Sequence, residues 1–455
     1  MRYKIKHGWN IGGVFFGLYL SIYFNLLILE SLSLIYFILY FLYFIDNLSK
    51  KILILEIGVL LAILTWLIAP LPFFHFFNES NDLAIKWVKV MPIESNEYYS
   101  FVLPATIAMM LGFHFRSKYD FILENTNLNF TRIKEYIKNK KVIGPFFVIV
   151  GFFAGLLIPI APSTLTFVLY LLQKLTYIGL LYMFFQDLPF KNFYLGLGVI
   201  LLLVHSIQLG MFGDLIHTVI LVGSLLVSNR NFSFIKKFWI ILFGLFCLLI
   251  LQSIKHEYRA VAWKQGANSS YFFTLLVERT LNPFGSLDEE NTFKYLTRFN
   301  QGYLIAKTMY HVPKDKPYAY GETVIKSIAA SIVPRLIWPT KPESGGKYNL
   351  ERFWGFKLSR YSMNIGSIGE AYGNFGKVGG IIFMFFYGLV YKMLLNLVLS
   401  LCLKRPTWLI WLPFIFLYAI AAETDIVTTT NFLTKTFIFI FILKITLKSM
   451  FKMNF

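Results

Sequence analysis

The sequence predicts an all-α protein that crosses a membrane many times. Of its 455 residues, 57% are hydrophobic and only 15% are charged, and the mean hydropathy is +0.61. Soluble domains carry about a quarter charged residues. Apolar stretches near the ~20 residues that a helix needs to cross a bilayer recur along the chain. These observations exclude an ordinary soluble domain.

About twelve stretches are apolar and long enough to be membrane spans. They cover residues 11–28, 31–45, 52–70, 100–115, 142–160, 163–185, 192–209, 213–228, 238–254, 378–402, 408–422 and 431–447. Residues 1–254 hold the N-terminal spans, residues 378–455 hold the C-terminal ones, and residues 255–377 form a long polar segment between the two groups. Two tightly joined pairs, the first two spans and those meeting at Gly210–Gly213, could instead be re-entrant hairpins.

The basic residues predict the orientation. Lys and Arg accumulate in short cytoplasmic loops of membrane proteins. Seven segments on one side of the predicted topology hold 21 Lys or Arg residues, whereas residues 71–99 hold only Lys86 and Lys89. Both termini are therefore expected in the cytoplasm, with residues 255–377 outside. Because topology accounts for much of the net charge of +19, no nucleic-acid partner is expected.

The outer segment, residues 255–377, carries 17 Lys or Arg against 10 Asp or Glu. Long translocated segments do not follow the positive-inside rule, so this excess requires another cause. Apolar helical patterns at Tyr271–Glu278 and Thr323–Val333 predict that the segment is folded against the membrane. The two cysteines, Cys247 and Cys402, lie in apolar spans and indicate no disulfide framework.

Three basic residues in the first part of the outer segment are candidates for the site. Lys255 and Arg259 are four residues apart and share one face if the ninth span continues outward as a helix. An Arg side chain matches phosphate oxygens, but interfacial anchoring beside Trp263 explains the same pattern. Arg298 lies in an expected amphipathic helix that starts near residue 292. It is either a further cation of the site or the partner of a nearby acidic residue.

The motif VPRLIWPTKP places two cations on an irregular backbone. Its three prolines, Pro334, Pro339 and Pro342, exclude a regular helix. Arg335 and Lys341 are thereby held at defined positions, with Trp338 between them. A preset basic loop suits a pyrophosphate leaving group. The alternative is a surface loop with solvated charges.

The motif GSIGEAYGNFGKVGG leads into the tenth span. Glycines recur every three or four residues between Gly366 and Gly380, which predicts a small-residue stripe along one helix face. Glu370 and Asn374 belong to an adjacent polar stripe. A carboxylate near a membrane span indicates a functional site, and Glu370 is the candidate general base or the partner of Arg335. The alternative is a carboxylate that stabilises a helix N-terminus.

These two motifs, with YRAVAW near residue 260, resemble the O-antigen polymerase-like family, the oligosaccharide repeat unit polymerases. The resemblance covers residues 255–388 best. It implies an all-helical, GT-C-like membrane glycosyltransferase in the bacterial cytoplasmic membrane. Its substrates would be polyprenyl-pyrophosphate-linked oligosaccharides, which arrive laterally from the membrane lipids. The glycan would pass from one lipid carrier to a newly flipped repeat unit, building a surface polysaccharide of the lipopolysaccharide kind.

The resemblance gives the candidate residues their roles. Arg259 and Arg335 would be catalytic at the pyrophosphate, and Glu370 would be the catalytic base. The expected substrate-binding residues are Arg298, Lys341, Asn374, Tyr372, Trp338 and Lys255. Because pyrophosphate is already a good leaving group, no metal ion or other cofactor is expected. A chain-length regulator and a flippase are the protein partners that this activity implies.

Two other functions fit the same topology. An O-antigen ligase would transfer a finished glycan and would favour a catalytic histidine, for which the outer segment offers His256 and His311. A flippase for the same lipid-linked units would carry functional groups near the middle of the membrane. Four polar residues near the outer ends of the seventh and eighth spans either line a sugar-binding cavity or bond between helices: His205, Gln208, Asp214 and His217. Lys174 and Glu56, in or near other spans, either pair with opposite charges or extend toward the membrane surface.

Overall fold

The computed structural model describes residues 2–209, 212–265, 269–282, 289–335, 337–357 and 362–451. Within these ranges every regular element is helical, which confirms the predicted all-α class.

The helices follow one another with short connections. The first group is α1 (Arg2–Tyr23), α2 (Ile28–Asn47), α3 (Leu55–Ala62) with a π-helical extension (Ile63–Ile68), α4 (Leu71–His75), α5 (Asp82–Lys86) and α6 (Ser95–Phe113). The second is α7 (Asp120–Glu124), α8 (Thr126–Ile137), α9 (Ile143–Leu157) with a 3-10 turn (Ile158–Ile160), α10 (Ser163–Gln173), α11 (Leu175–Phe185), α12 (Lys191–Leu209) and α13 (Gly213–Val227). The third is α14 (Phe234–Gln265), α15 (Ser269–Leu281), α16 (Glu289–Phe299), α17 (Gly302–His311), α18 (Glu322–Ile332), α19 (Lys347–Trp354), α20 (Gly366–Lys404), α21 (Trp408–Ile415) and α22 (Ile426–Phe451).

The described residues contain seven helical segments long and apolar enough to cross a membrane. They are Ile28–Asn47, Leu55–His75, Ile143–Ile160, Leu165–Phe185, Phe234–Arg259, Gly366–Lys404 and Ile426–Ser449, and two shorter apolar helices accompany them. The chain is therefore a multi-pass membrane protein. The predicted span 408–422 forms only the eight-residue α21, which contains Pro413 and ends at Ile415. Proline weakens a helix because it removes a backbone donor.

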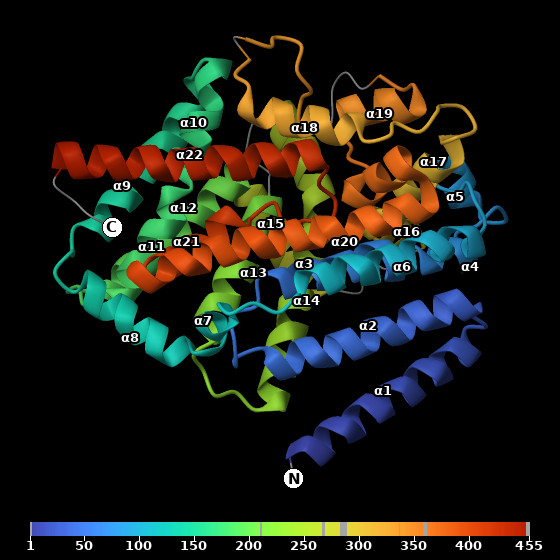
Figure 1. The fold of residues 1–455 in the computed structure, drawn as a ribbon, viewed down its shortest axis with the longest axis horizontal. Coiled ribbons are helices and arrows are strands. Elements are labelled where there is room, and N and C mark those ends of the chain that lie inside the picture. The colour runs from blue at the N-terminus through green and yellow to red at the C-terminus, as the bar shows by residue number, and fades with distance from the viewer. Residues whose placement is uncertain are drawn as a thin grey trace.

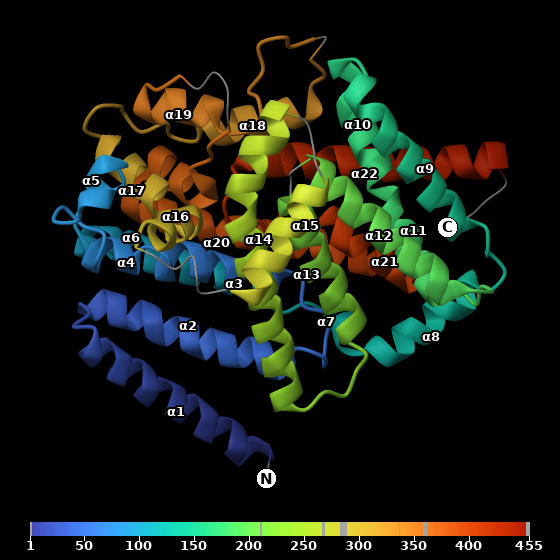
Figure 2. The ribbon, with the colours of Figure 1, turned by 180° about the vertical axis from the view of Figure 1, so that it is seen from behind.

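Helices α6 and α20 form the central pair and lie side by side in both views (Figure 1 and Figure 2). Glycines permit this contact. A Cβ atom on Gly112 would come within 2.3 Å of the Phe385 carbonyl oxygen, and one on Gly388 within 2.3 Å of the Met109 carbonyl oxygen. The two backbones touch directly, as small residues allow in membrane helix pairs.

The glycine stripe predicted from Gly366 to Gly380 does not lie on one straight helix. Gly376 has φ 68° and ψ −165°, so α20 is interrupted there. This backbone conformation is accessible mainly to glycine. The close approach itself is confirmed, since a Cβ atom on Gly373 would meet the Phe353 ring at 2.5 Å. The glycines thus seat α19 against the first part of α20 instead of marking a continuous membrane face.

The outer segment folds into a helical cap. Helices α16, α17 and α19 gather near the N-terminal ends of α6 and α20 (Figure 1 and Figure 2). The predicted patterns at residues 271–278 and 323–333 correspond to α15 and α18, and Arg298 lies on α16. The predicted boundaries at 254/255 and 377/378 fall inside helices, because α14 and α20 run through them.

Candidate functional site

A cavity of about 620 Å³ lies among the ends of α10, α12, α13 and α14 and is called the basic cavity below. Its lining residues are Ile158, Thr166, Phe167, Tyr170, Gln173, Lys174, Tyr177, His205, Ser206, Gly213, Asp214, Lys255, Arg259 and Tyr418. Three are cations, and only Asp214 is acidic. The predicted candidates Lys255 and Arg259 therefore meet residues from five other segments of the chain.

A further cation strengthens the positive charge of the basic cavity. Arg298 on α16 lies within electrostatic range of both Lys255 and Arg259. Burial lowers the pKa of Arg298, as expected for a cation held partly out of water. Glu423, which carries the opposite charge, also lies within electrostatic range of Lys255. Lys255, Arg259 and Arg298, which the sequence singled out separately, form one group.

The carboxylate in the basic cavity is fully engaged. Asp214 accepts hydrogen bonds from Lys174 Nζ at 2.9 Å, from Tyr418 Oη at 3.1 Å and from Tyr170 Oη. The Lys174 ammonium also lies 4.6 Å from the centre of the Tyr170 ring. Asp214 thus offsets the charge of Lys174.

Neutral polar groups complete the lining. His205 Nε2 contacts the side-chain amide of Gln173, and both residues face the basic cavity. Sequence reasoning did not select Gln173, Tyr170 or Tyr418, because amides and phenols are common in membrane helices. The usable signal was the pair of charged residues, Lys174 and Asp214, inside apolar stretches. The side chains of Gln208 and His256 lie outside the described residues.

The two cations of the VPRLIWPTKP motif, Arg335 and Lys341, have different environments. Lys341 is buried, and its ammonium donates to the carbonyl oxygens of Ala330 and Val333, each at 2.6 Å. These carbonyls belong to the last turn of α18 and the residue after it, so Lys341 caps that helix. Burial and the neighbouring Arg335 lower the pKa of Lys341. Two of its three ammonium donors are used by the end of α18, so the structure favours a helix-capping role, and a role of Lys341 at a pyrophosphate stays a prediction.

Arg335 lies on the surface. Its side chain is 51% exposed and pairs with Glu343 at 3.4 Å. Trp338 is partly buried in the same loop. Lys435 on α22 lies within electrostatic range of Arg335 and Lys341, and its ammonium lies 4.2 Å from the centre of the Phe167 ring. Since Phe167 lines the basic cavity, this second cluster borders the cavity wall without lining it.

Glu370 lies inside the protein and not at the surface of the basic cavity. Its side chain is wholly buried, and it accepts hydrogen bonds from Thr323 Oγ1 at 2.7 Å, Asn349 Nδ2 at 3.1 Å and the Ile426 backbone N–H at 3.1 Å. Glu370 is absent from the described lining of the basic cavity. The burial and the three hydrogen bonds favour a structural role for Glu370, and its role as a general base stays a prediction.

Asn374 and Tyr372 support the same region. Asn374 Nδ2 donates to Thr323 Oγ1 at 2.7 Å, and its Oδ1 accepts from the Gly321 backbone at 3.0 Å. Tyr372 packs edge-on against Phe101. Glu370, Thr323, Asn349 and Asn374 are called the buried carboxylate network below. It joins α18, α19 and α20 to the start of α22, and neither Asn374 nor Tyr372 lines the basic cavity as described.

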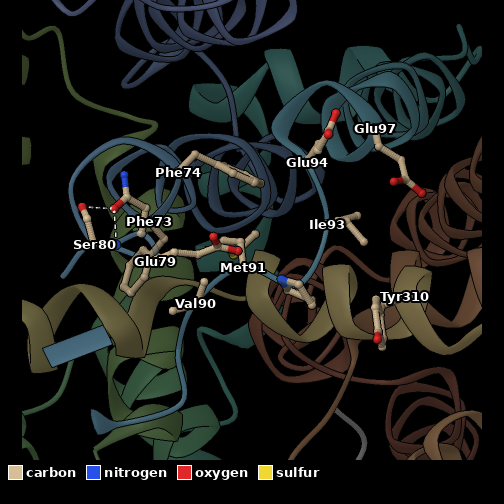
Figure 3. Close-up of a pocket in the computed structure, with 12 residues that line it drawn as sticks. Phe73, Phe74, Glu79, Ser80, Val90, Met91, Ile93, Glu94, Glu97 and Tyr310 are labelled. Carbon is tan, nitrogen blue, oxygen red and sulfur yellow. Dashed lines mark hydrogen bonds between the residues drawn. The ribbon is translucent and has the colours of Figure 1, made fainter. Parts of the chain in front are cut away.

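A second cavity, of about 750 Å³, has the opposite charge (Figure 3). Glu79, Glu94 and Glu97 line it, together with Phe73, Phe74 and the α17 residue Tyr310. It is called the acidic cavity below. Although it is larger, its carboxylates repel a pyrophosphate, so the basic cavity is the better site for that group.

The described part of the chain holds one further candidate histidine, His311. His311 Nδ1 pairs with Asp315 at 2.6 Å on the surface of α17, away from the described lining of either cavity. The described residues contain no group of three or more His, Cys, Asp or Glu side chains that could hold a metal ion.

The family model described as "Domain of unknown function (DUF8712)" matches residues 63–401, which is well over half of the chain. The matched range includes every lining residue of the basic cavity except Tyr418. The chain belongs to this family. No curated protein and no solved structure matches the chain.

Proposed function

We propose that this member of the DUF8712 family polymerises polyprenyl-pyrophosphate-linked oligosaccharide repeat units into a surface polysaccharide. The observation that supports this most is the meeting of Lys255, Arg259 and Lys174 in one cavity, with Arg298 close behind. The cavity lies at helix ends that the basic-residue pattern assigns to the outer face of the membrane. A lipid-linked substrate held in the bilayer can present its pyrophosphate there.

The proposed donor site matches the chemistry of a pyrophosphate leaving group. Arg259 offers a planar set of donors that suits phosphate oxygens, and Lys255 adds a point charge. Glycosyl transfer breaks the bond between the anomeric carbon and the pyrophosphate oxygen, and the leaving group takes the electron pair. Preorganised cations in a water-poor site stabilise the charge that develops on that oxygen.

The acceptor hydroxyl must lose a proton as its oxygen bonds to the anomeric carbon. Two proton acceptors line the basic cavity, His205 and Asp214. Asp214 is engaged by Lys174 and two tyrosines, which reduces its capacity to accept a proton. His205 is therefore the proposed general base in place of Glu370, with Gln173 as the residue that positions it.

The proposal extends to topology and location. It places the chain in the bacterial cytoplasmic membrane with both termini in the cytoplasm and about twelve spans in a GT-C-like arrangement. A chain-length regulator and a flippase are the proposed protein partners, and the substrates enter laterally from the lipid.

Reconstitution tests this function directly. The purified full-length protein, in vesicles that contain lipid-linked repeat units, is expected to lengthen them without an ion gradient. Arg259→Ala is expected to slow lengthening about 10²–10³-fold. Transfer of a finished glycan to a separate acceptor, with no lengthening, would identify a ligase. Movement of unmodified units between leaflets would identify a flippase. Either result would overturn the proposal.

A further inference from the structure

Two lysines outside the basic cavity meet at one tyrosine. The ammonium of Lys89, from the connection between α5 and α6, lies 4.5 Å from the centre of the Tyr303 ring. The ammonium of Lys307, on α17, lies 5.4 Å from the same centre and 5.6 Å from that of Trp354. A basic residue in residues 71–99 is also an exception to the charge pattern that set the topology. Lys89 therefore calls for an explanation of its own.

Structural contacts hold the two lysines together. Tyr303 Oη donates to the Val88 carbonyl oxygen at 2.7 Å, which fixes the connection directly before Lys89. Val88 itself has φ 51°, a conformation that is costly for a β-branched residue. On the other side, Trp354 Nε1 donates to Thr308 Oγ1 at 3.1 Å and anchors the second ring beside Lys307. The fold thus maintains a strained connection that keeps like charges close.

Among the described residues, the charges of Lys89 and Lys307 have no carboxylate close by. In the described part of the chain, neither Lys89 nor Lys307 forms a salt bridge with a carboxylate. Burial and the neighbouring Lys307 lower the pKa of Lys89. A bound anion would offset the repulsion and form charge-assisted hydrogen bonds with both ammonium groups.

We propose that Lys89 and Lys307 form a second anion site, which binds the acidic group of a negatively charged sugar on the acceptor glycan. This rests on the proposed polymerase function, because that function supplies an acceptor glycan on the outer side. Two compact ammonium groups suit a single carboxylate or phosphate carried by one sugar. The Tyr303 and Trp354 rings hold the two ammonium groups through cation–π contacts. Binding of the anion does not require a sugar to stack on these rings.

The neighbouring acidic cavity favours a glycan as the occupant. Val90 and Met91 directly follow Lys89 and line that cavity, and Tyr310 lines it one helical turn beyond Lys307. Carboxylates accept hydrogen bonds from sugar hydroxyls. A glycan can therefore place hydroxyls in the acidic cavity and its one acidic group on the lysine pair. The substrate class that follows is a repeat unit containing a uronic acid or a phosphate-substituted sugar.

Direct binding tests the site without requiring catalysis. The probes are a tetrasaccharide of glucuronate and N-acetylglucosamine and the same compound with its carboxylates reduced to alcohols. The purified full-length protein in phosphatidylcholine nanodiscs is expected to bind the acidic form about tenfold more tightly, which corresponds to about 1.4 kcal/mol. Lys89→Gln and Lys307→Gln are expected to abolish the difference, and Lys307→Arg to retain it. Lys86→Gln, at the last residue of α5, is the matched control.

Equal binding of both probes, or lysine variants that bind like the unmodified protein, would overturn the site. Nanodiscs with phosphatidylglycerol provide a separate comparison. If the lysine variants lose affinity for this anionic lipid and keep their affinity for the acidic glycan, the site belongs to the membrane surface and the proposal is wrong. The assay measures binding without elongation. The binding result can therefore be interpreted even if the protein does not show the proposed polymerase activity.

Discussion

The basic cavity and the buried carboxylate network both place charged side chains near the membrane, yet they differ in how those charges are used. In the network, Glu370 accepts three hydrogen bonds and has no exposed surface. At the basic cavity, Lys255 and Arg259 line an open space, and Arg298 lies within electrostatic range of both. The hydrogen bonds of the fold hold the first arrangement, whereas the second concentrates positive charge beside a cavity.

This difference separates stability from function. Removing one partner of a buried, hydrogen-bonded carboxylate destabilises the fold, because the remaining groups are left unsatisfied. A group of like charges beside a cavity is costly in the absence of a ligand and useful in its presence. Variants in the two regions are therefore expected to affect different measurements: activity for the cavity, and unfolding for the network.

The largest expected effect is on proton transfer. His205→Gln is expected to lower the rate of elongation by about 10²–10⁴-fold, the usual contribution of a general base. The measurement is single-turnover lengthening of lipid-linked repeat units by reconstituted protein. His311→Gln, on the surface of α17, is the control and should retain activity. The reverse pattern would favour the ligase interpretation.

Removing a cation from the basic cavity is expected to have the next largest effect. Arg259→Ala should reduce the rate constant about 10²–10³-fold, because a preorganised donor to the leaving group is lost. Its unfolding temperature should stay close to that of the unmodified protein. Arg116→Ala, an exposed arginine between α6 and α7, is the matched control. Equal losses in both variants would remove the distinction between the two regions.

The buried carboxylate network is expected to respond in stability. Glu370→Ala leaves the donors of Thr323, Asn349 and Ile426 without their acceptor and should cost about 3 kcal/mol of unfolding free energy. Thermal unfolding in detergent measures this loss. Glu351→Ala removes only the exposed partner of Lys357 and should change stability by under about 1 kcal/mol. A Glu370→Ala protein that is stable but inactive would restore the catalytic prediction.

The smallest expected effect concerns Lys341, which caps the end of α18. Lys341→Met removes two hydrogen bonds to the end of α18 and should destabilise the protein by about 1–2 kcal/mol. Elongation at a temperature well below unfolding should be retained. A loss of activity as large as that of Arg259→Ala would place Lys341 at the substrate after all.

Much of the fold was predictable from the sequence, but less of the site was. Apolar stretches identify helices because backbone polar groups must be satisfied internally in lipid. Lys255 and Arg259 were identified as a pair on one helix face, and they line the same cavity. The burial of Glu370 was not predictable, because sequence does not show which helices cover a side chain. The contribution of Gln173 was not predictable, because it depends on which helix ends meet.

The affinity for polyprenyl pyrophosphate tests the central claim most directly. Unmodified protein in nanodiscs is expected to bind this lipid more tightly than polyprenyl monophosphate. The double variant Lys255→Gln/Arg259→Gln should lose at least about tenfold in affinity, or about 1.4 kcal/mol, with its unfolding temperature retained. Unchanged affinity in a folded double variant would contradict the assignment of the basic cavity as the donor site.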